Sequence, residues 1–205
     1  MKRFVVISVL LAGLGMAASP AAATSIHVQV NTAPLNGNAA APFYVDFSFT
    51  DGSGTLAGPN TVVVSNFTFA GGGAVGAPTL SGGAAGNLAS SVTLSDNANP
   101  FSEFFQQFTP GAVLGFDVTT TNNVDPISPD AFAFAILDKN LLNLPTTGLQ
   151  DSLMLVNIAR SDAFATASTT APAGVNVTAA VIPEPGTLLL LGTGVVAVFR
   201  RRTRT

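Results

Sequence analysis

The chain contains no cysteine and no tryptophan, and it has a single histidine and a single tyrosine. The absence of cysteine excludes disulfide bonds, thiolate metal sites, iron–sulfur clusters and cysteine nucleophiles. Any histidine-dependent catalytic triad would have to use His27. Charged residues are also scarce, at 9% of the 205 residues, against about 25% in an average soluble domain. The length suits one domain of ordinary size or two small ones.

The few charges are unevenly distributed along the chain. Six of the eight lysine and arginine residues lie in the first three or the last six positions. Residues 24–182 hold ten carboxylates and two bases, which gives this body a formal charge near −8. It lacks the clustered bases that contacts with phosphates require, so nucleic-acid binding is excluded.

The N-terminus has the three parts of a secretory signal peptide. Lys2 and Arg3 are followed by an apolar stretch, residues 4–14, and then by the small residues Ala21 and Ala23. This order predicts export across the inner membrane and cleavage by signal peptidase after Ala23. The alternative is a permanent N-terminal anchor, but the apolar stretch is shorter than the roughly 20 residues that span a bilayer.

Three segments follow one another at the C-terminus: a Pro-Glu-Pro element, an apolar run and an arginine cluster. They comprise Pro183, Glu184 and Pro185; residues 188–199; and Arg200, Arg201 and Arg202. As a helix the 12-residue run would be about 18 Å long, shorter than a hydrocarbon core of about 30 Å. The arginines should stay on the cytoplasmic side. A short apolar stretch with a basic stop suits a transient anchor that is later removed.

This C-terminal order closely resembles the PEP-CTERM sorting signal of Gram-negative bacteria. The resemblance implies that an exosortase, a membrane-embedded cysteine protease or transpeptidase, processes the chain near the Pro-Glu-Pro element. It also implies a link to systems that make exopolysaccharide and biofilm matrix, with delivery to the cell surface or the extracellular matrix. The alternative is an ordinary tail-anchoring helix.

The body between the two ends alternates apolar and polar residues with the period of a β-strand. Clear examples are Ile26, Val28 and Val30, and then the residues of 43–50; Val63, Phe67 and Phe69 are predicted to share a face of 61–70. Such alternation favours antiparallel sheets with one buried and one wet face. Glycine-rich turns separate the strands, and residues 71–86, which have few apolar anchors, are predicted to form a mobile loop.

One segment departs from this pattern. Phe101, Phe104, Phe105 and Phe108 recur at helical spacing after Asn99-Pro100, which predicts a short helix that covers one end of the core. The predicted fold is therefore all-β, a single antiparallel β-sandwich of jelly-roll type with this short helix. The predicted domains are the signal peptide (1–23), the sandwich (24–182) and the sorting tail (183–205), with a helix in each terminal segment.

No catalytic, cofactor-binding or metal-binding residue is predicted in the body. His27 is expected to be an exposed side chain on the first strand, with no serine or aspartate spacing that suggests a triad. The loop carboxylates, among them Asp51, Asp96, Asp125 and Asp130, lack the spaced calcium-loop pattern. We therefore interpret them as turn and cap residues, with a Ca²⁺ site as the alternative.

These observations lead to a functional hypothesis in which the chain is not an enzyme. It is expected to be an exported surface or matrix protein with a structural or adhesive role. Its expected partners are signal peptidase, exosortase, the inner membrane transiently, and exopolysaccharide. The first alternative is a carbohydrate-binding module, with or without Ca²⁺. The second is a secreted hydrolase, which the lack of a nucleophile, base and metal set disfavours.

Overall fold

The structure is a computed structural model that describes residues 24–56, 58–121, 123, 128–158, 163–166 and 174–182. Its strands are β1 (Thr24–Asn31), β2 (Phe43–Thr50), β3 (Thr61–Thr68), β4 (Gly73–Ala74), β5 (Thr79–Ser81), β6 (Ala85–Gly86), β7 (Val92–Ser95), β8 (Phe101–Thr109), β9 (Val113–Thr120), β10 (Asp130–Leu137), β11 (Met154–Ile158), β12 (Ala163–Thr166) and β13 (Val177–Ile182). Helix among these residues is limited to two 3-10 turns, η1 (Ala33–Leu35) and η2 (Leu149–Asp151), and no described helix is long and apolar enough to span a membrane.

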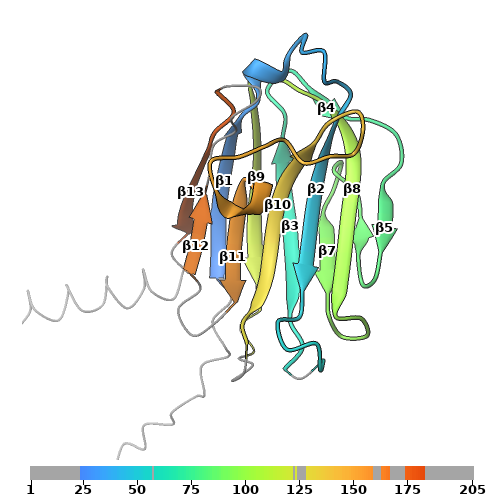
Figure 1. Cartoon of the computed structure of the whole chain (residues 1–205), viewed down its shortest axis with the longest axis vertical. Helices are drawn as coiled ribbons and strands as arrows, with labels where there is room; N and C mark the ends of the chain where they lie inside the picture. Colours follow the sequence, from blue (N-terminus) through green and yellow to red (C-terminus); the bar gives the residue numbers. More distant parts are fainter. Residues whose placement is uncertain are drawn as a thin grey trace, which may run out of the picture.

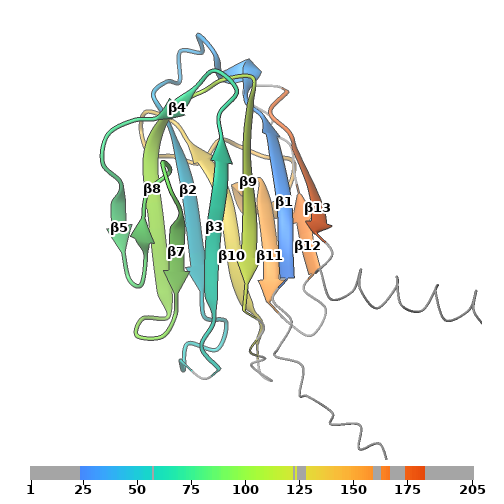
Figure 2. The same cartoon turned by 180° about the vertical axis from the view of Figure 1, so that it is seen from behind.

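The strands form two antiparallel sheets that lie one behind the other (Figures 1 and 2). The first, called here the β1 sheet, has the order β13-β1-β9-β3-β7-β6. The second, the β2 sheet, has the order β12-β11-β10-β2-β8-β4, and β5 also pairs with β8. The prediction of an all-β, antiparallel body is therefore confirmed.

One hydrophobic core lies between the two sheets. Ile26, Val28 and Val30 of β1 are all fully buried, which confirms the alternation seen in the sequence. Phenylalanines link the layers: the ring centroids of Phe47 in β2 and Phe116 in β9 are 5.4 Å apart, in an edge-to-face arrangement. Phe116 also meets Phe134 of β10 at 5.1 Å. These rings fill the core of a chain that has no tryptophan.

The prediction of a short helix over residues 101–108 is wrong, because this segment is the longest strand, β8. It pairs with β2 from Phe101 to Phe108 and with β4 and β5 on its other side. Phe104 and Phe108 point into the core, while Phe101 is 45% exposed and Phe105 is half-buried. The helical pattern treated four phenylalanines as one buried face, whereas the strand divides them between two faces.

The alternation of apolar and polar residues in β8 could not be seen in the sequence, because two of its inward-facing residues are polar. The Ser102 hydroxyl donates to the Ser95 carbonyl at 2.7 Å and accepts the Gly83 amide at 2.8 Å. The Gln106 side chain accepts the Leu88 amide and donates to the Gly76 carbonyl. Since burial of a polar group is tolerated when it is hydrogen-bonded, these inward positions could be polar. Their partners lie 7 to 30 residues away in sequence, so a local pattern could not identify them.

The face assignment of β3 and the loop over 71–86 also need correction. Val62 and Val64 face the core, not Val63, and a bulge between Ser65 and Thr68 then brings Phe67 partly into the core. The predicted loop contains the short strands β4, β5 and β6.

The strand assignment of β8 predicts unequal costs for the same substitution at two of its phenylalanines. Phe104→Leu is expected to lower the free energy of unfolding by about 1 kcal/mol, because the buried ring stacks on Phe47 with centroids 5.9 Å apart. Phe101→Leu should change it by less than about 0.5 kcal/mol, because that ring is exposed. Chemical denaturation of the wild type and both variants measures these changes in the free energy of unfolding. Equal costs would support a helix with all four rings buried.

The first and last described strands are neighbours at one side of the β1 sheet. β1 and β13 are antiparallel, with Ser25 opposite Ile182 and Val30 opposite Val177. Residue 24, where the predicted mature chain begins, therefore lies one strand spacing from the end of β13. The sequence continues from β13 directly into Pro183.

Candidate functional site

The residues predicted to direct sorting and processing lie outside the described residues. They are Ala21, Ala23, Pro183, Glu184, Pro185, Arg200, Arg201 and Arg202. The same holds for the predicted signal helix, the predicted sorting helix and Asp125. The described residues all belong to the body, where polar side chains gather at three places that we consider as candidate sites.

The first grouping surrounds His27 on the outer face of the β1 sheet. His27 is 49% exposed and its Nδ1 lies 2.6 Å from Oδ1 of Asp117 on the neighbouring strand. Asn66 donates to the other carboxylate oxygen at 2.7 Å. Although partial burial opposes it, the bonds from Asn66 and His27 lower the pKa of Asp117. Nε2 of His27 lies 3.5 Å from the Gln29 amide nitrogen. The two ring nitrogens thus face a carboxylate and an amide, and no hydroxyl nucleophile among the described residues hydrogen-bonds to the ring.

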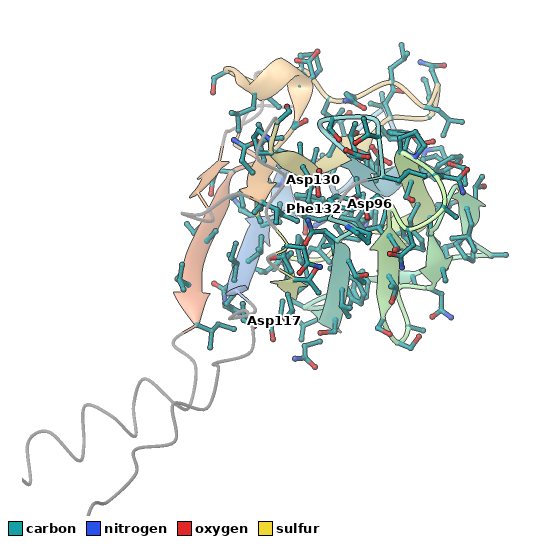
Figure 3. All side chains as sticks on the ribbon, turned by 90° about the horizontal axis from the view of Figure 1, so that it is seen from below. Asp96, Asp117, Asp130 and Phe132 are labelled. Atoms are coloured by element: carbon teal, nitrogen blue, oxygen red, sulfur yellow. The ribbon has the colours of Figure 1, made fainter. Side chains whose placement is uncertain are left out.

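The second grouping is a buried polar network at one end of the sandwich, where Figure 3 labels Asp96 and Asp130 close together. Asp51 accepts the backbone amides of Ser53, Gly54 and Leu56, a turn role. Although burial opposes it, these bonds, that of Leu56 foremost, lower the pKa of Asp51. Burial raises the pKa of Asp96 to about 6, with a contribution from the Asp130 charge.

Asn60 holds this network together from a position that is almost completely buried. Its Nδ2 donates to Oδ2 of Asp130 at 2.7 Å and to the carbonyl of Asn123 at 2.7 Å. Its Oδ1 accepts from the Thr121 hydroxyl and the Asn123 amide. Among the described residues no group of three or more His, Cys, Asp or Glu side chains could hold a metal ion. The network therefore joins loops and strand ends.

The third grouping lies on the outer face of the β2 sheet, under the segment that links β10 to β11. Figure 1 shows this segment, with the turn η2, crossing in front of the sheet. Between it and the sheet is a half-open hollow of about 550 Å³. Its floor is formed by Ser48 and Thr50 of β2 and Ala131 and Ala133 of β10, and its wall by Leu149, Ser152 and Leu155. Small floor residues give the hollow its depth.

Two carboxylates stand beside this hollow on the same face. Glu103 of β8 is directly opposite Ser48, and Asp46 is two residues before Ser48 on β2. Asp46 is only 8% exposed, and its Oδ1 is buried without a hydrogen-bond partner. Burial raises the pKa of the Asp46 carboxyl to about 7, and the nearby charge of Glu103 adds to the rise. Among the described residues, Asp46 and Thr120 are the two whose side chains have a buried oxygen without a hydrogen-bond partner.

The sequence interpretation did not identify the hollow or its carboxylates. Asp46, Ser48 and Thr50 alternate with the core phenylalanines of β2, which marks them as outer-face residues. Nothing local indicates that the segment after β10 returns to cover that face. The sequence carries no signal of it, because Asp46 is a polar residue on the face expected to be wet, and only the structure shows that it is buried.

Comparison with known proteins gives information about the C-terminus. A search among curated proteins and a search among solved structures each found no match. Residues 181–202 match the family model of the PEP-CTERM protein-sorting motif. The match begins inside β13 and extends over the Pro-Glu-Pro element, the apolar run and three of the arginines. The chain thus carries a PEP-CTERM sorting motif, the mark of an exported protein with a membrane-anchored sorting signal that an exosortase processes.

Proposed function

We propose that the chain is a non-enzymatic surface or matrix protein with a structural or adhesive role in the exopolysaccharide of its host. Signal peptidase and exosortase remove the two terminal segments, and the β-sandwich is the mature product. The inner membrane holds the chain only until this processing is complete. The proposal includes a Gram-negative host and a biofilm setting, both taken from the resemblance of the tail.

The position of β13 is the observation that carries this proposal. The matched motif starts at Val181, and β13 ends at Ile182. The sorting signal therefore follows the last strand without a linker. The start of the predicted mature chain lies beside it, across the β1–β13 pair. Removal of both ends at these points leaves the strand order of the sandwich complete.

The strand order supports the jelly-roll interpretation of the body. In one sheet β1, β9, β3 and β7 are neighbours, and in the other β2, β8 and β4 are neighbours. Successive long strands therefore alternate between the sheets, the arrangement expected of two interleaved Greek keys. β10 to β13 extend the two sheets at one side. Such a fold serves many unrelated functions, so the function rests on the tail and the surface.

The sorting signal can be tested without disturbing the body. Glu184→Gln and deletion of residues 200–204 should both leave the sandwich folded but abolish its delivery to the cell surface. Surface labelling and fractionation of host cells measure delivery, and protease resistance of the body measures folding. Glu103→Gln, the same chemical change in the sandwich, is the matched control and should be delivered normally. Normal delivery of both tail variants would contradict a sorting role.

A second candidate function is a carbohydrate-binding module. The hollow on the β2 sheet favours it, because small-molecule sites are concave and combine apolar walls with a few polar groups. In this case the adhesive role would depend on one defined site. A secreted hydrolase is disfavoured because the described hydroxyls, histidine and carboxylates do not combine into a nucleophile with an adjacent base.

A further inference from the structure

We propose that the hollow over β2 and β10 binds a neutral hexopyranose unit of a polysaccharide, as the recognition site of the adhesive function proposed above. The inference rests on that proposed function for the source of the ligand. The chemical class of the ligand is argued from the outer face of the β2 sheet. Four properties of this face support it: size, free hydroxyls, unpaired carboxylates and an exposed aromatic ring.

The size of the hollow suits one sugar ring within a longer chain. Its volume of about 550 Å³ lies within the roughly 300–1,000 Å³ typical of small-molecule sites. It is half open, so a polymer can pass through with one unit seated. Ala131 and Ala133 keep the floor low, while Leu149 and Leu155 form apolar sides against which the C–H groups of a pyranose can pack.

Three hydroxyl groups in the hollow have unused hydrogen-bonding capacity. They belong to Ser48, Thr50 and Ser152, and none of them bonds to another group in the described part of the chain. A hydroxyl both donates and accepts, so it can pair with a sugar hydroxyl of either orientation. The turn η2, which carries the wall residue Leu149, has an uncommon backbone: Leu149 and Asp151 both have positive φ, at 53° and 65°. Such strain in non-glycine residues is concentrated at functional sites.

The carboxylates beside the hollow select the charge of the ligand. Glu103 lies across from Ser48, and no ion pair or hydrogen bond engages Glu103 or Asp46 among the described residues. Of the two, Glu103 is the carboxylate that a ligand can contact, because Asp46 is only 8% exposed. An ionised carboxylate only accepts hydrogen bonds, so Glu103 requires donors such as sugar hydroxyls. It would repel the carboxylate of a uronic acid. Two carboxylates also fall short of the six to eight oxygen ligands that Ca²⁺ takes, so recognition should be independent of metal.

Phe101 supplies an aromatic surface next to the hollow. It is the cross-strand partner of Thr50 and therefore shares its face, and its ring is 45% exposed. Further along the same face, Phe105 meets Tyr44 edge to face, with ring centroids 6.2 Å apart. Exposed aromatic side chains bury a large apolar area on binding at a low entropic cost. Assigning 101–108 to a helix would have placed these rings in the core.

The experiment measures retardation of the full-length chain, in mild detergent, by affinity electrophoresis through gels that contain a polysaccharide. The neutral probes are dextran, a galactan and a mannan, and alginate is the polyuronate comparator, each run with and without EDTA. We expect retardation by at least one neutral polymer, none by alginate, and no effect of EDTA. Ala133→Leu, which fills the floor, should weaken binding about tenfold or more. Phe101→Ala, which removes rather than adds volume, should weaken it about three- to tenfold.

Ala180→Leu is the matched control, because Ala180 is exposed on β13 in the other sheet. It should leave binding within about twofold. Thermal unfolding of all three variants shows that they are folded. Binding to neutral polymers that neither hollow variant weakens would overturn the site but leave the adhesive function. Binding to none of the three neutral polymers, preference for alginate, or loss of binding in EDTA would overturn the proposed ligand. The processing and delivery of the chain are tested separately by the tail variants.

Discussion

Asn60→Asp is expected to lower the free energy of unfolding by about 3–5 kcal/mol at pH 7, the cost of an uncompensated buried charge. The substitution keeps the shape of the side chain. It replaces the nitrogen that donates to Asp130, Gly58 and Asn123 with an oxygen that faces three acceptors. Asp96 and Asp130 already place negative charge at this end of the sandwich. Urea unfolding as a function of pH measures the effect.

The pH dependence separates electrostatics from lost packing. The new carboxyl should have a raised pKa in the folded state, so its destabilising effect should shrink as the pH falls from 7 towards 5. Asn87→Asp is the matched control: Oδ1 of Asn87 accepts from the Ala89 amide and the Ser90 hydroxyl, bonds that an aspartate keeps. It should change stability by less than about 0.5 kcal/mol. A cost for Asn60→Asp no larger than that of its control would show that Asn60 does not organise the network.

Asp46→Asn is expected to stabilise the protein by about 2–4 kcal/mol at pH 8. The pKa of Asp46 is raised from 3.8 to about 7, chiefly by burial. Stability contributed by the protonated form is therefore complete below pH 4 and is lost as the pH rises through 7. Each pH unit across this window costs up to about 1.4 kcal/mol. Asparagine stays neutral, so the variant should lose this dependence, at the cost of an imperfectly paired amide.

Two further variants test the cause of the effect. Glu103→Gln removes the like charge and should lower the pKa of Asp46, so the loss of stability with rising pH should be smaller and should end at a lower pH than in the wild type. This effect should be absent when Glu103→Gln is combined with Asp46→Asn. Asp138→Asn should have the opposite sign to Asp46→Asn, because the Leu142 and Asn140 amides lower the pKa of Asp138. The pKa of Asp96 is also raised, so both Asp46 and Asp96 contribute to the pH dependence of the wild-type free energy of unfolding. The difference in free energy of unfolding between wild type and Asp46→Asn contains the contribution of Asp46 alone. If that difference is the same at pH 5 and pH 8, Asp46 is ionised throughout and the burial argument fails.

The strands were predictable where alternation is undisturbed. β1 follows it residue by residue, and β2 follows it except at the buried Asp46; the core positions Ile26, Val28 and Phe47 could be identified from the sequence. β8 could not, because the spacing of its phenylalanines fits one face of a helix, whereas the strand divides them between two faces. Ser102 and Gln106 resolve the ambiguity only through bonds to distant backbone groups. Local periodicity contains no information about those partners.

The hollow is a property of tertiary structure alone. Ser48 and Ala133 are cross-strand neighbours, yet they are 85 positions apart in the sequence. Leu149 reaches them only because the segment after β10 folds back over the sheet (Figure 1). The sorting tail, in contrast, could be recognised from the sequence, because its proline, apolar and arginine elements follow one another within a short stretch of chain. The motif match at 181–202 confirms that prediction. The sorting signal was therefore easier to predict than the hollow.

Intact mass spectrometry of the protein from its native host, with cell-surface and membrane fractions kept apart, tests the central claim most directly. The claim is that the β-sandwich is released or transferred after both ends are removed. It predicts a surface species that begins near Thr24 and ends near Pro185, with any addition at its new C-terminus visible as extra mass. A species that still ends at Thr205 and stays in the membrane fraction would contradict the claim and make the tail a permanent anchor.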